Sequence, residues 1–492
     1  MLLAILSGLL TALSMPGFLS GVLIWFSLIP LLKAMERRSP IWCGFLSFLY
    51  FYTHISISFY WVFPTLTENF PEVFGRFPGW VGGIVFFLMG VIEALPFLGF
   101  GILYGIFSKR VRRNPKLELF FVPSLYLLFE YLRGIGDLGF TGGRLSDALY
   151  KNLGIVQLAS IGGTLLLVFI IVFVNTLFYI LVKRRSFKML YIFMVLGVVY
   201  TFDAIVGWYL PPPKSGSVEI VALQPNIPTK VKYNVSEKEL LEKFTRLIQG
   251  LQNTFVVTPE AFFMTDISKT RTKETLERIS SERNLKILVG FPTFGERKYN
   301  QVSLIDGKLS SQQYAKVKLF PFVEKLPYPF IFRIFSFLKA LDYFDSGKEY
   351  TVFKVENFPP FSVQICFESY FSEISREEVK NGASFLIVVT NDGWFHYRTA
   401  LIQHFSQIVF RAVETRRDFL QVANTGITGK VDRYGRILKI LKPGEEARCT
   451  FEVSPNDERT IYTLLGDYMV YISLGILLFC ILISPSGKSP FS

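Results

Sequence analysis

The chain has 492 residues, of which 51% are hydrophobic and only 18% are charged. It is far more apolar than an ordinary soluble protein, so we expect much of it to be embedded in a membrane. The net charge of +13 does not indicate nucleic-acid binding. The basic residues cluster in short loops between apolar runs, where anionic lipid headgroups explain them better.

Hydropathy divides the chain into a membrane front, a polar middle and a closing anchor. The apolar runs cover residues 2–14, 19–35, 43–63, 79–107, 117–134, 153–182, 188–210 and 466–485. A helix that crosses a bilayer needs about 20 apolar residues, so these runs predict about eight transmembrane helices, the first being the weakest. We expect a membrane domain of about seven helices over 1–213, a polar domain over 214–457, and a last helix with a short cytoplasmic tail over 458–492.

Loop charges predict the orientation of the spans. Lysines and arginines crowd the connections at 33–38, 109–116 and 183–188. The positive-inside rule places these loops in the cytoplasm. By alternation the polar domain lies on the opposite side, which is the periplasm in a bacterium with two membranes.

The polar domain shows short strands alternating with helices. Apolar strand-like runs occur at 218–223, 254–257, 287–289, 361–365, 385–389 and 419–422, with helical patterns at 236–252, 269–284 and 399–417. This alternation favours a layered α/β architecture.

Three chemically distinct side chains stand at or near predicted strand ends. Glu260 follows Val-Val-Thr-Pro, Lys316 lies in Tyr-Ala-Lys-Val-Lys, and Cys366 ends a β-like run. A carboxylate, an ammonium and a thiol together suffice for nucleophilic catalysis without histidine. Taken singly, each has a plainer interpretation: a buried core cysteine, a surface carboxylate and a solvated lysine. Their order and sequence contexts make the combination specific.

With Asn391-Asp392-Gly393-Trp394-Phe395 downstream, this order resembles the nitrilase, or carbon–nitrogen hydrolase, superfamily. A domain of this kind inserted between about seven spans and a final one is similar to the apolipoprotein N-acyltransferases. Gln224-Pro225-Asn226-Ile227-Pro228 resembles that family's domain-opening segment, and the segment 321–327, Pro-Phe-Val-Glu-Lys-Leu-Pro, resembles its Pro-Phe-Gly-Glu-x-x-Pro loop. The resemblance implies an inserted α/β nitrilase-like domain, an αββα sandwich.

The resemblance also implies roles for individual residues. Glu260 would be the general base, Lys316 the oxyanion stabiliser and Cys366 the nucleophile. Further residues would support the reaction or bind substrate: Glu324 and Glu368 as acidic supports, the backbone of Phe367 as a donor, and Asn226, Tyr233 and Trp394 on the substrate side.

Three positions depart from the family pattern. Thr258 stands where Trp commonly precedes the Pro-Glu pair, Val323 replaces the loop glycine, and Phe367 stands where Tyr often follows the nucleophile. None of these departures removes one of the three proposed catalytic residues.

The implied reaction is acyl transfer in a bacterial inner membrane. A fatty acyl chain would pass from a phospholipid, expected to be phosphatidylethanolamine, through a cysteine thioester to the N-terminal amine of a diacylglyceryl apolipoprotein. No metal or nucleotide cofactor and no nucleic acid is expected to take part.

Two further segments allow alternatives. Residues 328–344 are very apolar, and we expect an arm that dips into the lipid through Phe332 and Phe335; burial in the domain core is the alternative. On the 399–417 helix we assign His404 to structure and expect Arg411, Glu414, Arg416 and Arg417 to form a solvated or ion-paired face.

Two other classes of function compete with the acyltransferase. A membrane-tethered amidase, with water as the acceptor, would need only one anchor, so eight spans favour a substrate that resides in the bilayer. A transporter or scaffold should carry ionisable residues within its spans. Apart from Glu93, Glu130, Asp203 and Asp467, few such residues lie in or near the apolar runs.

Overall fold

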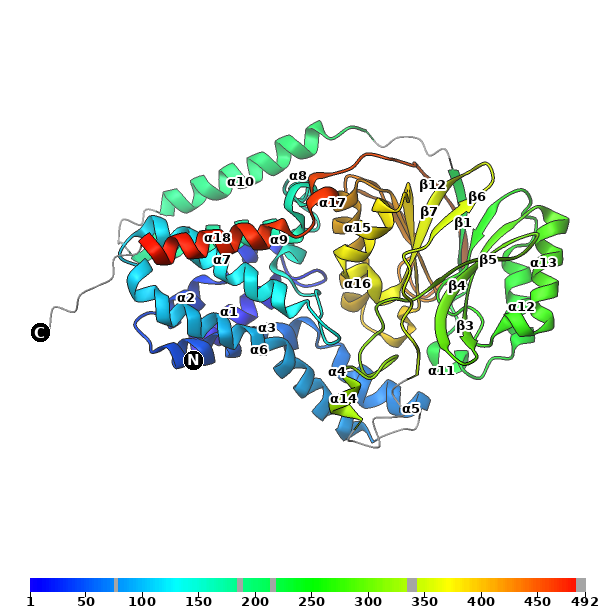
Figure 1. Ribbon diagram of the computed structural model, residues 1–492, viewed down its shortest axis with the longest axis horizontal. Helices are drawn as coiled ribbons and strands as arrows, with labels where there is room; N and C mark the ends of the chain where they lie inside the picture. The colour runs from blue at the N-terminus through cyan, green and yellow to red at the C-terminus, as the bar shows by residue number, and fades with distance from the viewer. Residues whose placement is uncertain (75–77, 184–188, 213–217, 334–342, 484–492) are drawn as a thin grey trace, which may run out of the picture. The chain divides into compact units, whose positions relative to one another are not determined.

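The computed structural model describes residues 1–74, 78–183, 189–212, 218–333 and 343–483 (Figure 1). The chain forms two compact units. The first contains residues 1–71, 75–210 and 465–492, and the second contains residues 72–74 and 211–464.

The first unit is helical. Its elements are α1 (Leu2–Ser14), η1 (Gly21–Trp25), α2 (Ile29–Ala34), α3 (Pro40–Ser58), α4 (Val62–Pro64), η2 (Thr65–Asn69), α6 (Gly79–Val111), α7 (Pro115–Arg133), η3 (Leu145–Leu149), α8 (Leu153–Val156), α9 (Ala159–Lys183), α10 (Met189–Tyr209) and α18 (Tyr468–Ile483). The short helices α5 (Phe70–Phe74) and α17 (Ile461–Leu465) lie where the chain passes between units.

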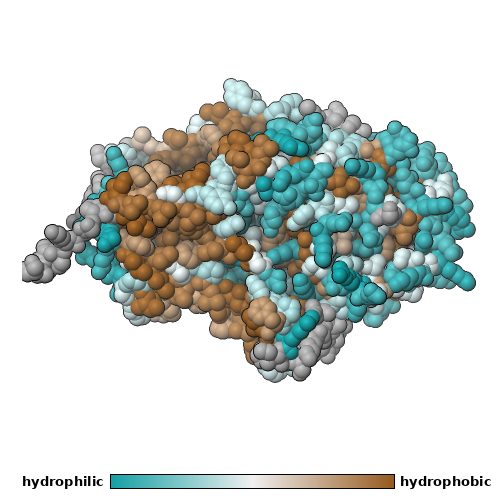
Figure 2. Space-filling view, in the orientation of Figure 1, coloured by the Kyte–Doolittle hydropathy of each residue, from teal (hydrophilic) through white to brown (hydrophobic). Residues whose placement is uncertain are grey.

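Three of the described helices, α3, α6 and α9, are long and apolar enough to cross a membrane. Apolar residues gather on the surface of the helical unit (Figure 2). Shorter apolar helices occur at 2–14, 21–34, 193–209 and 468–483. The expectation of about eight spans is therefore met only in part.

The run 19–35, predicted as one span, is not a continuous helix. The helical hydrogen bonding stops between η1 and α2, and the side chain of Asn175 satisfies the groups left open. Its Oδ1 accepts from the Leu28 N–H at 2.9 Å, and its Nδ2 donates to the Ile24 carbonyl at 2.9 Å. A buried amide from a distant helix thus replaces two partners that a straight helix would supply.

The second unit is a four-layer αββα sandwich (Figure 1). One six-stranded sheet has the order β12 (Ala447–Val453), β1 (Val218–Gln224), β2 (Phe255–Val257), β3 (Lys286–Phe294), β4 (Lys298–Asp306), β5 (Lys308–Ala315). The other has the order β11 (Ile437–Ile440), β10 (Gly429–Val431), β9 (Phe419–Ala423), β8 (Phe385–Thr390), β7 (Phe358–Ile365), β6 (Val352–Val355). This confirms the expected nitrilase-like architecture.

Two apolar cores hold the layers together. Alternate residues of both sheets, among them Ile220, Val257, Val363 and Ile387, fill the space between the sheets. The opposite face of the first sheet packs on α12 (Glu237–Leu247) and α13 (Arg271–Arg283). Helices α15 (Ser372–Lys380) and α16 (Arg398–Thr415) contact the second sheet. The shorter helical elements of this unit are α11 (Thr229–Lys232), η4 (Ile267–Lys269), α14 (Pro329–Phe332), η6 (Cys366–Tyr370) and η7 (Asp392–Trp394).

The charged residues of α16 are ion-paired but not solvated. Arg411 and Glu414 are 1% and 0% exposed, and the Arg411 Nε lies 2.7 Å from the Glu414 Oε2. Of the two alternatives expected for this face, ion-paired or solvated, the ion-paired one holds for Arg411 and Glu414, because a buried charge needs an opposite charge beside it.

Parallel strands bring the candidate catalytic residues together at the carboxyl ends of the two sheets. β1, β2 and β3 start as a parallel set in the first sheet, while β7, β8 and β9 are parallel in the second. Parallel strands share their carboxyl ends along one edge of a sheet. Glu260 follows β2, Cys366 follows β7 and Asn391 follows β8, so turns that are far apart in the sequence meet there.

Candidate active site

A buried ammonium between two carboxylates forms the centre of the site. Lys316, directly after β5, is 2% exposed, and its Nζ lies 3.3 Å from Glu260 Oε1 and 2.9 Å from Glu324 Oε2. Burial alone would lower the pKa of Lys316, but the charges of Glu324 and Glu260 outweigh it and raise the pKa above its usual value. The ammonium therefore stays charged at neutral pH.

Two asparagines hold the carboxylates in place. The Asn300 Nδ2 donates to Glu260 Oε1 at 2.8 Å and to Glu324 Oε1 at 3.0 Å, and the Asn300 carbonyl accepts from the Lys316 N–H at 2.9 Å. From the other sheet, the Asn391 N–H donates to Glu260 Oε2 at 3.0 Å. Glu260 thus joins the two sheets and has both oxygens engaged. The sequence pattern does not single out Asn300, which stands beside Gln301 in a strand of mixed polar and apolar residues.

Cys366 sits at a sharp elbow where β7 passes into η6. Its φ of 54° lies in the left-handed region, which residues with a side chain seldom adopt. Burial, reinforced by the Glu260 carboxylate, raises the pKa of the Cys366 thiol well above its usual value, and the Lys316 ammonium opposes this. The thiol is therefore protonated at neutral pH until a base removes its proton.

Glu368 ties the elbow to the strand that carries Lys316. Its Oε1 accepts from the Val317 and Lys318 N–H groups at 2.7 and 3.0 Å, and its Oε2 accepts from the Ile365 N–H at 2.8 Å. The Tyr314 hydroxyl donates to Oε1 at 2.8 Å. Burial raises the pKa of Glu368 to about 7, against the pull of these donors. Glu368 therefore links the end of β7 in one sheet to the segment that follows β5 in the other through hydrogen bonds.

A second buried lysine, which was not among the predicted site residues, contacts the turn that carries Glu260. Lys232 in α11 is 1% exposed, and its Nζ donates to the Glu260 carbonyl at 3.2 Å. Burial lowers the pKa of Lys232 to about 8, and the charges of Glu260 and Cys366 partly offset that effect. Nothing in the sequence distinguishes Lys232 from the neighbouring Lys230, which is exposed.

The residues predicted to bind substrate or support the reaction make contacts of different kinds. Tyr233 and Trp394 lie together, with ring centroids 5.7 Å apart. The Asn226 amide donates to the Gly444 carbonyl at 2.7 Å, so it holds a loop. Phe367 is 5% exposed and packs on Phe320.

Two further residues, Phe332 and Phe335, were predicted to carry the arm that dips into the lipid. Phe332 ends α14. Phe335 lies outside the described residues.

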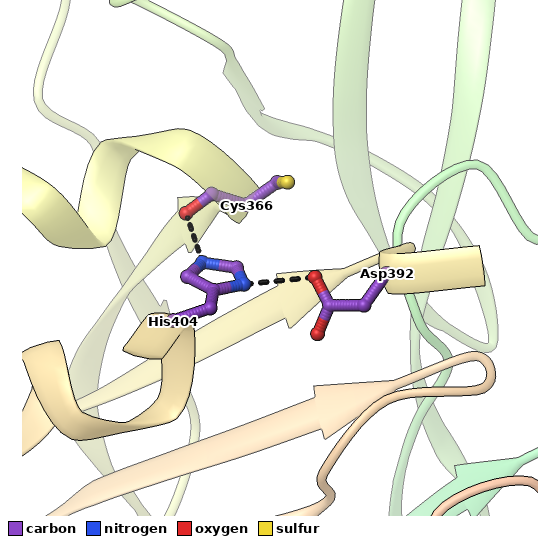
Figure 3. Close-up of side chains that lie close together, drawn as sticks. All are labelled: Cys366, Asp392 and His404. Atoms are coloured by element: carbon purple, nitrogen blue, oxygen red, sulfur yellow. Dashed lines mark hydrogen bonds and ion pairs between the residues drawn. The ribbon is translucent and has the colours of Figure 1, made fainter. Parts of the chain in front are cut away.

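Cys366, Asp392 and His404 also lie close together, with a possible ligand atom of each within 4.8 Å of the others (Figure 3). The imidazole is already occupied, however. Its Nδ1 is 2.8 Å from Asp392 Oδ1 and its Nε2 is 3.1 Å from the Cys366 carbonyl oxygen. The Asp392 carboxylate and the Cys366 carbonyl can only accept hydrogen bonds, and the Ser369 hydroxyl also lies 3.1 Å from Nε2. Both ring nitrogens are therefore engaged within the protein, and the cluster does not fit a metal ion.

Comparison with known proteins agrees with this arrangement. The family model described as apolipoprotein N-acyltransferase N-terminal domain matches residues 7–177, and the model described as carbon-nitrogen hydrolase matches residues 220–462. An apolipoprotein N-acyltransferase of Thermotoga maritima is 53% identical over 98% of this chain and 93% of its own length. A protein of the same name from Geobacter metallireducens is 28% identical over 96% of this chain and 92% of its own.

The charges around Cys366 predict opposite effects of two substitutions on its reactivity. Glu260→Gln removes a negative charge and should lower the pKa of the thiol, so alkylation by iodoacetamide should shift to lower pH. Lys316→Met removes a positive charge and should shift alkylation to higher pH. Intact-protein mass spectrometry at a series of pH values measures both, with Cys366→Ala as the background. Shifts in the same direction for both variants would contradict this electrostatic account.

The close packing of Gly290 against Glu260 predicts a second effect. A Cβ at Gly290 in β3 would lie 2.6 Å from the Pro259 carbonyl oxygen and 2.9 Å from the Ala261 nitrogen. Gly290→Ala should therefore displace the turn that carries Glu260 and lower acyl transfer by about 100-fold. Gly295→Ala is the matched control, since its Cβ would meet only the Arg297 carbonyl at 3.8 Å. Equal turnover of the two variants would show that the Gly290 contact does not set the position of Glu260.

Proposed function

Because the chain belongs to the apolipoprotein N-acyltransferase family, we propose that it moves a fatty acyl chain from a membrane phospholipid to the N-terminal amine of a diacylglyceryl apolipoprotein, through a thioester on Cys366. The observation that carries this proposal is the buried Glu260–Lys316–Glu324 cluster beside a cysteine held at an elbow. The apolar helices of the first unit fit a substrate that resides in a bilayer.

The first half-reaction forms the thioester. Glu260 takes the proton of the Cys366 thiol, and the thiolate sulfur attacks the ester carbonyl carbon of the phospholipid. The negative charge that develops on the carbonyl oxygen faces the Lys316 ammonium and the backbone after Cys366. When the intermediate collapses, the carbon–oxygen ester bond breaks and the leaving alkoxide takes the proton from Glu260. A lysophospholipid departs.

The second half-reaction discharges the thioester. The amine of the acceptor attacks the thioester carbonyl, and Glu260 accepts the proton that the nitrogen loses. Collapse breaks the carbon–sulfur bond and returns the thiol. Because the donor product leaves before the acceptor reacts, the kinetics are ping-pong. Glu324 does not touch the reacting atoms in this scheme; its carboxylate holds the Lys316 ammonium at 2.9 Å.

We place the enzyme in the inner membrane, with the sandwich unit facing the periplasm. Phosphatidylethanolamine is the proposed donor. The basic loops at 33–38, 109–116 and 183–188 support this orientation through the positive-inside rule.

The proposed reaction predicts a covalent intermediate. Incubation of the detergent-purified enzyme with phosphatidylethanolamine should add one fatty-acyl mass, removable by hydroxylamine and absent from Cys366→Ala. A diacylated lipopeptide should discharge the adduct with formation of an N-acylated product. An adduct lost to water at the same rate with and without the lipopeptide would indicate a hydrolase instead. No adduct in the folded enzyme would refute the thioester.

The segment after Tyr328 is proposed to reach into the lipid. Phe330 and Ile331 on α14 are 80% and 45% exposed, an unusual display of apolar surface for a loop of the sandwich unit. Phe330→Ser should lower turnover of phospholipid in vesicles by about tenfold, because the loss of buried apolar area weakens lipid contact. Turnover of a short-chain, water-soluble ester should stay unchanged.

Ile437→Ser provides the control for this prediction. Ile437 is also an exposed apolar residue of the sandwich unit, at 43% exposure, but it lies on β11. An equal loss in the two variants would show that α14 has no special role at the lipid surface.

A further inference from the structure

His404 lies beside the proposed nucleophile without any part in the reaction described above. It stands on α16, is 4% exposed, and is held between two groups that accept hydrogen bonds. In Figure 3 the imidazole ring lies between the Cys366 carbonyl oxygen and the Asp392 carboxylate, while the sulfur points away from the ring. The contact is therefore to the backbone of the nucleophile and not to its thiol.

Hydrogen bonds to the Cys366 carbonyl oxygen can stabilise the backbone conformation of the elbow. A left-handed φ of 54° at a residue with a side chain is strained and persists only where neighbours enforce it. Two donors converge on this carbonyl oxygen: the Ser369 hydroxyl at 3.1 Å and the His404 Nε2 at 3.1 Å. Together they fix the orientation of the peptide that follows Cys366, and with it the direction of the thiol.

Asp392 orients the imidazole. Its Oδ1 lies 2.8 Å from His404 Nδ1 and also accepts from the Thr390 hydroxyl at 2.9 Å. Its Oδ2 has no hydrogen-bond partner among the described residues. The His404 ring is stacked on Tyr370, with the planes 2° apart. The ring therefore has a fixed plane, with Nδ1 toward Asp392 and Nε2 toward the Cys366 carbonyl and the Ser369 hydroxyl.

The charges that face His404 agree with this arrangement. Burial would lower the pKa of the imidazole, but the Asp392 carboxylate outweighs burial and raises it, with smaller contributions from the Cys366 carbonyl and Glu260. The other titratable groups that face the ring on the described elements are the Tyr370 phenol, which is stacked on it, and the Cys366 thiol, whose sulfur lies within 4.8 Å of a ring nitrogen. A protonated imidazole can donate from both nitrogens at once, to Asp392 and to the Cys366 carbonyl, while the Ser369 hydroxyl, 3.1 Å from Nε2, donates to the same carbonyl.

We propose that His404, oriented by Asp392, is a positioning residue that holds the nucleophile elbow by donating its Nε2 hydrogen to the Cys366 carbonyl. This inference rests on the proposed role of Cys366 as the nucleophile. It assigns the Asp392–His404 pair to the orientation of the thiol, whereas proton transfer stays with Glu260.

Two substitutions of His404 separate the hydrogen bond from the charge. In His404→Gln the side-chain amide reaches the position of Nε2 and keeps the donor to Cys366. In His404→Asn the shorter amide reaches the position of Nδ1 and keeps only the contact to Asp392. Both remove the positive charge, so a difference between them reports the Cys366 contact alone.

The rate of thioester formation with phosphatidylethanolamine is measured by intact-protein mass spectrometry. His404→Gln should react within about threefold of the unchanged enzyme because the hydrogen bond is kept. His404→Asn should be slower by about 100-fold, as expected for a misplaced reacting group. The two melting temperatures should agree. Ser406→Ala, which removes a buried hydroxyl bonded only within α16 to the Gln403 carbonyl, controls for damage to the helix and should react normally.

Equal rates for the Gln and Asn variants at equal melting temperatures would overturn the inference, whether both are fast or both are slow. Alkylation of Cys366 by iodoacetamide across pH provides a readout that does not depend on acyl transfer. If the unchanged enzyme forms no thioester, the proposed function fails. A slower alkylation of the Asn variant than of the Gln variant would then still support the positioning role, and equal alkylation would refute it.

Discussion

One buried positive charge, the ammonium of Lys316, constrains the rest of the site. A charge removed from water is tolerated only with opposite charges and hydrogen bonds around it. Glu260 and Glu324 supply the charges, and the Asn300 side-chain amide binds both carboxylates while the Asn300 backbone carbonyl accepts from the Lys316 N–H. Because these groups pair with one another, displacing any one of them removes a charge or hydrogen-bond partner from another. The rigidity that catalysis needs therefore follows from charge compensation.

A second constraint fixes Cys366, the proposed nucleophile, relative to this cluster. Cys366 belongs to one sheet and Lys316 to the other, and the apolar core between the sheets sets their separation. Glu368 crosses the gap by accepting backbone hydrogens from both segments. Asn391 makes a similar crossing to Glu260. The site is thus built where two sheets meet, and its precision depends on packing as much as on the polar contacts.

The sequence predicted the six apolar strands and the helices at 236–252, 269–284 and 399–417, since each follows a clear apolar pattern. It did not predict β4 and β5, where Asn300, Gln301, Ser303, Gln312 and Gln313 interrupt the pattern. Those polar residues lie on strands that complete the site or form the sheet edge. The break in the run 19–35 was also missed, because Asn175, which makes it possible, lies about 150 residues away in the sequence.

The sequence by itself determined which chemical groups are available: a carboxylate, an ammonium and a thiol near strand ends, in an order that carries the family resemblance. Only the tertiary structure decided which groups act on one another. Lys232, Asn300 and His404 look ordinary in the sequence, and each becomes significant because burial and a specific partner change what it can do. The physical reason is that pKa values and hydrogen bonds depend on distance and desolvation, and neither can be read from positions along a chain.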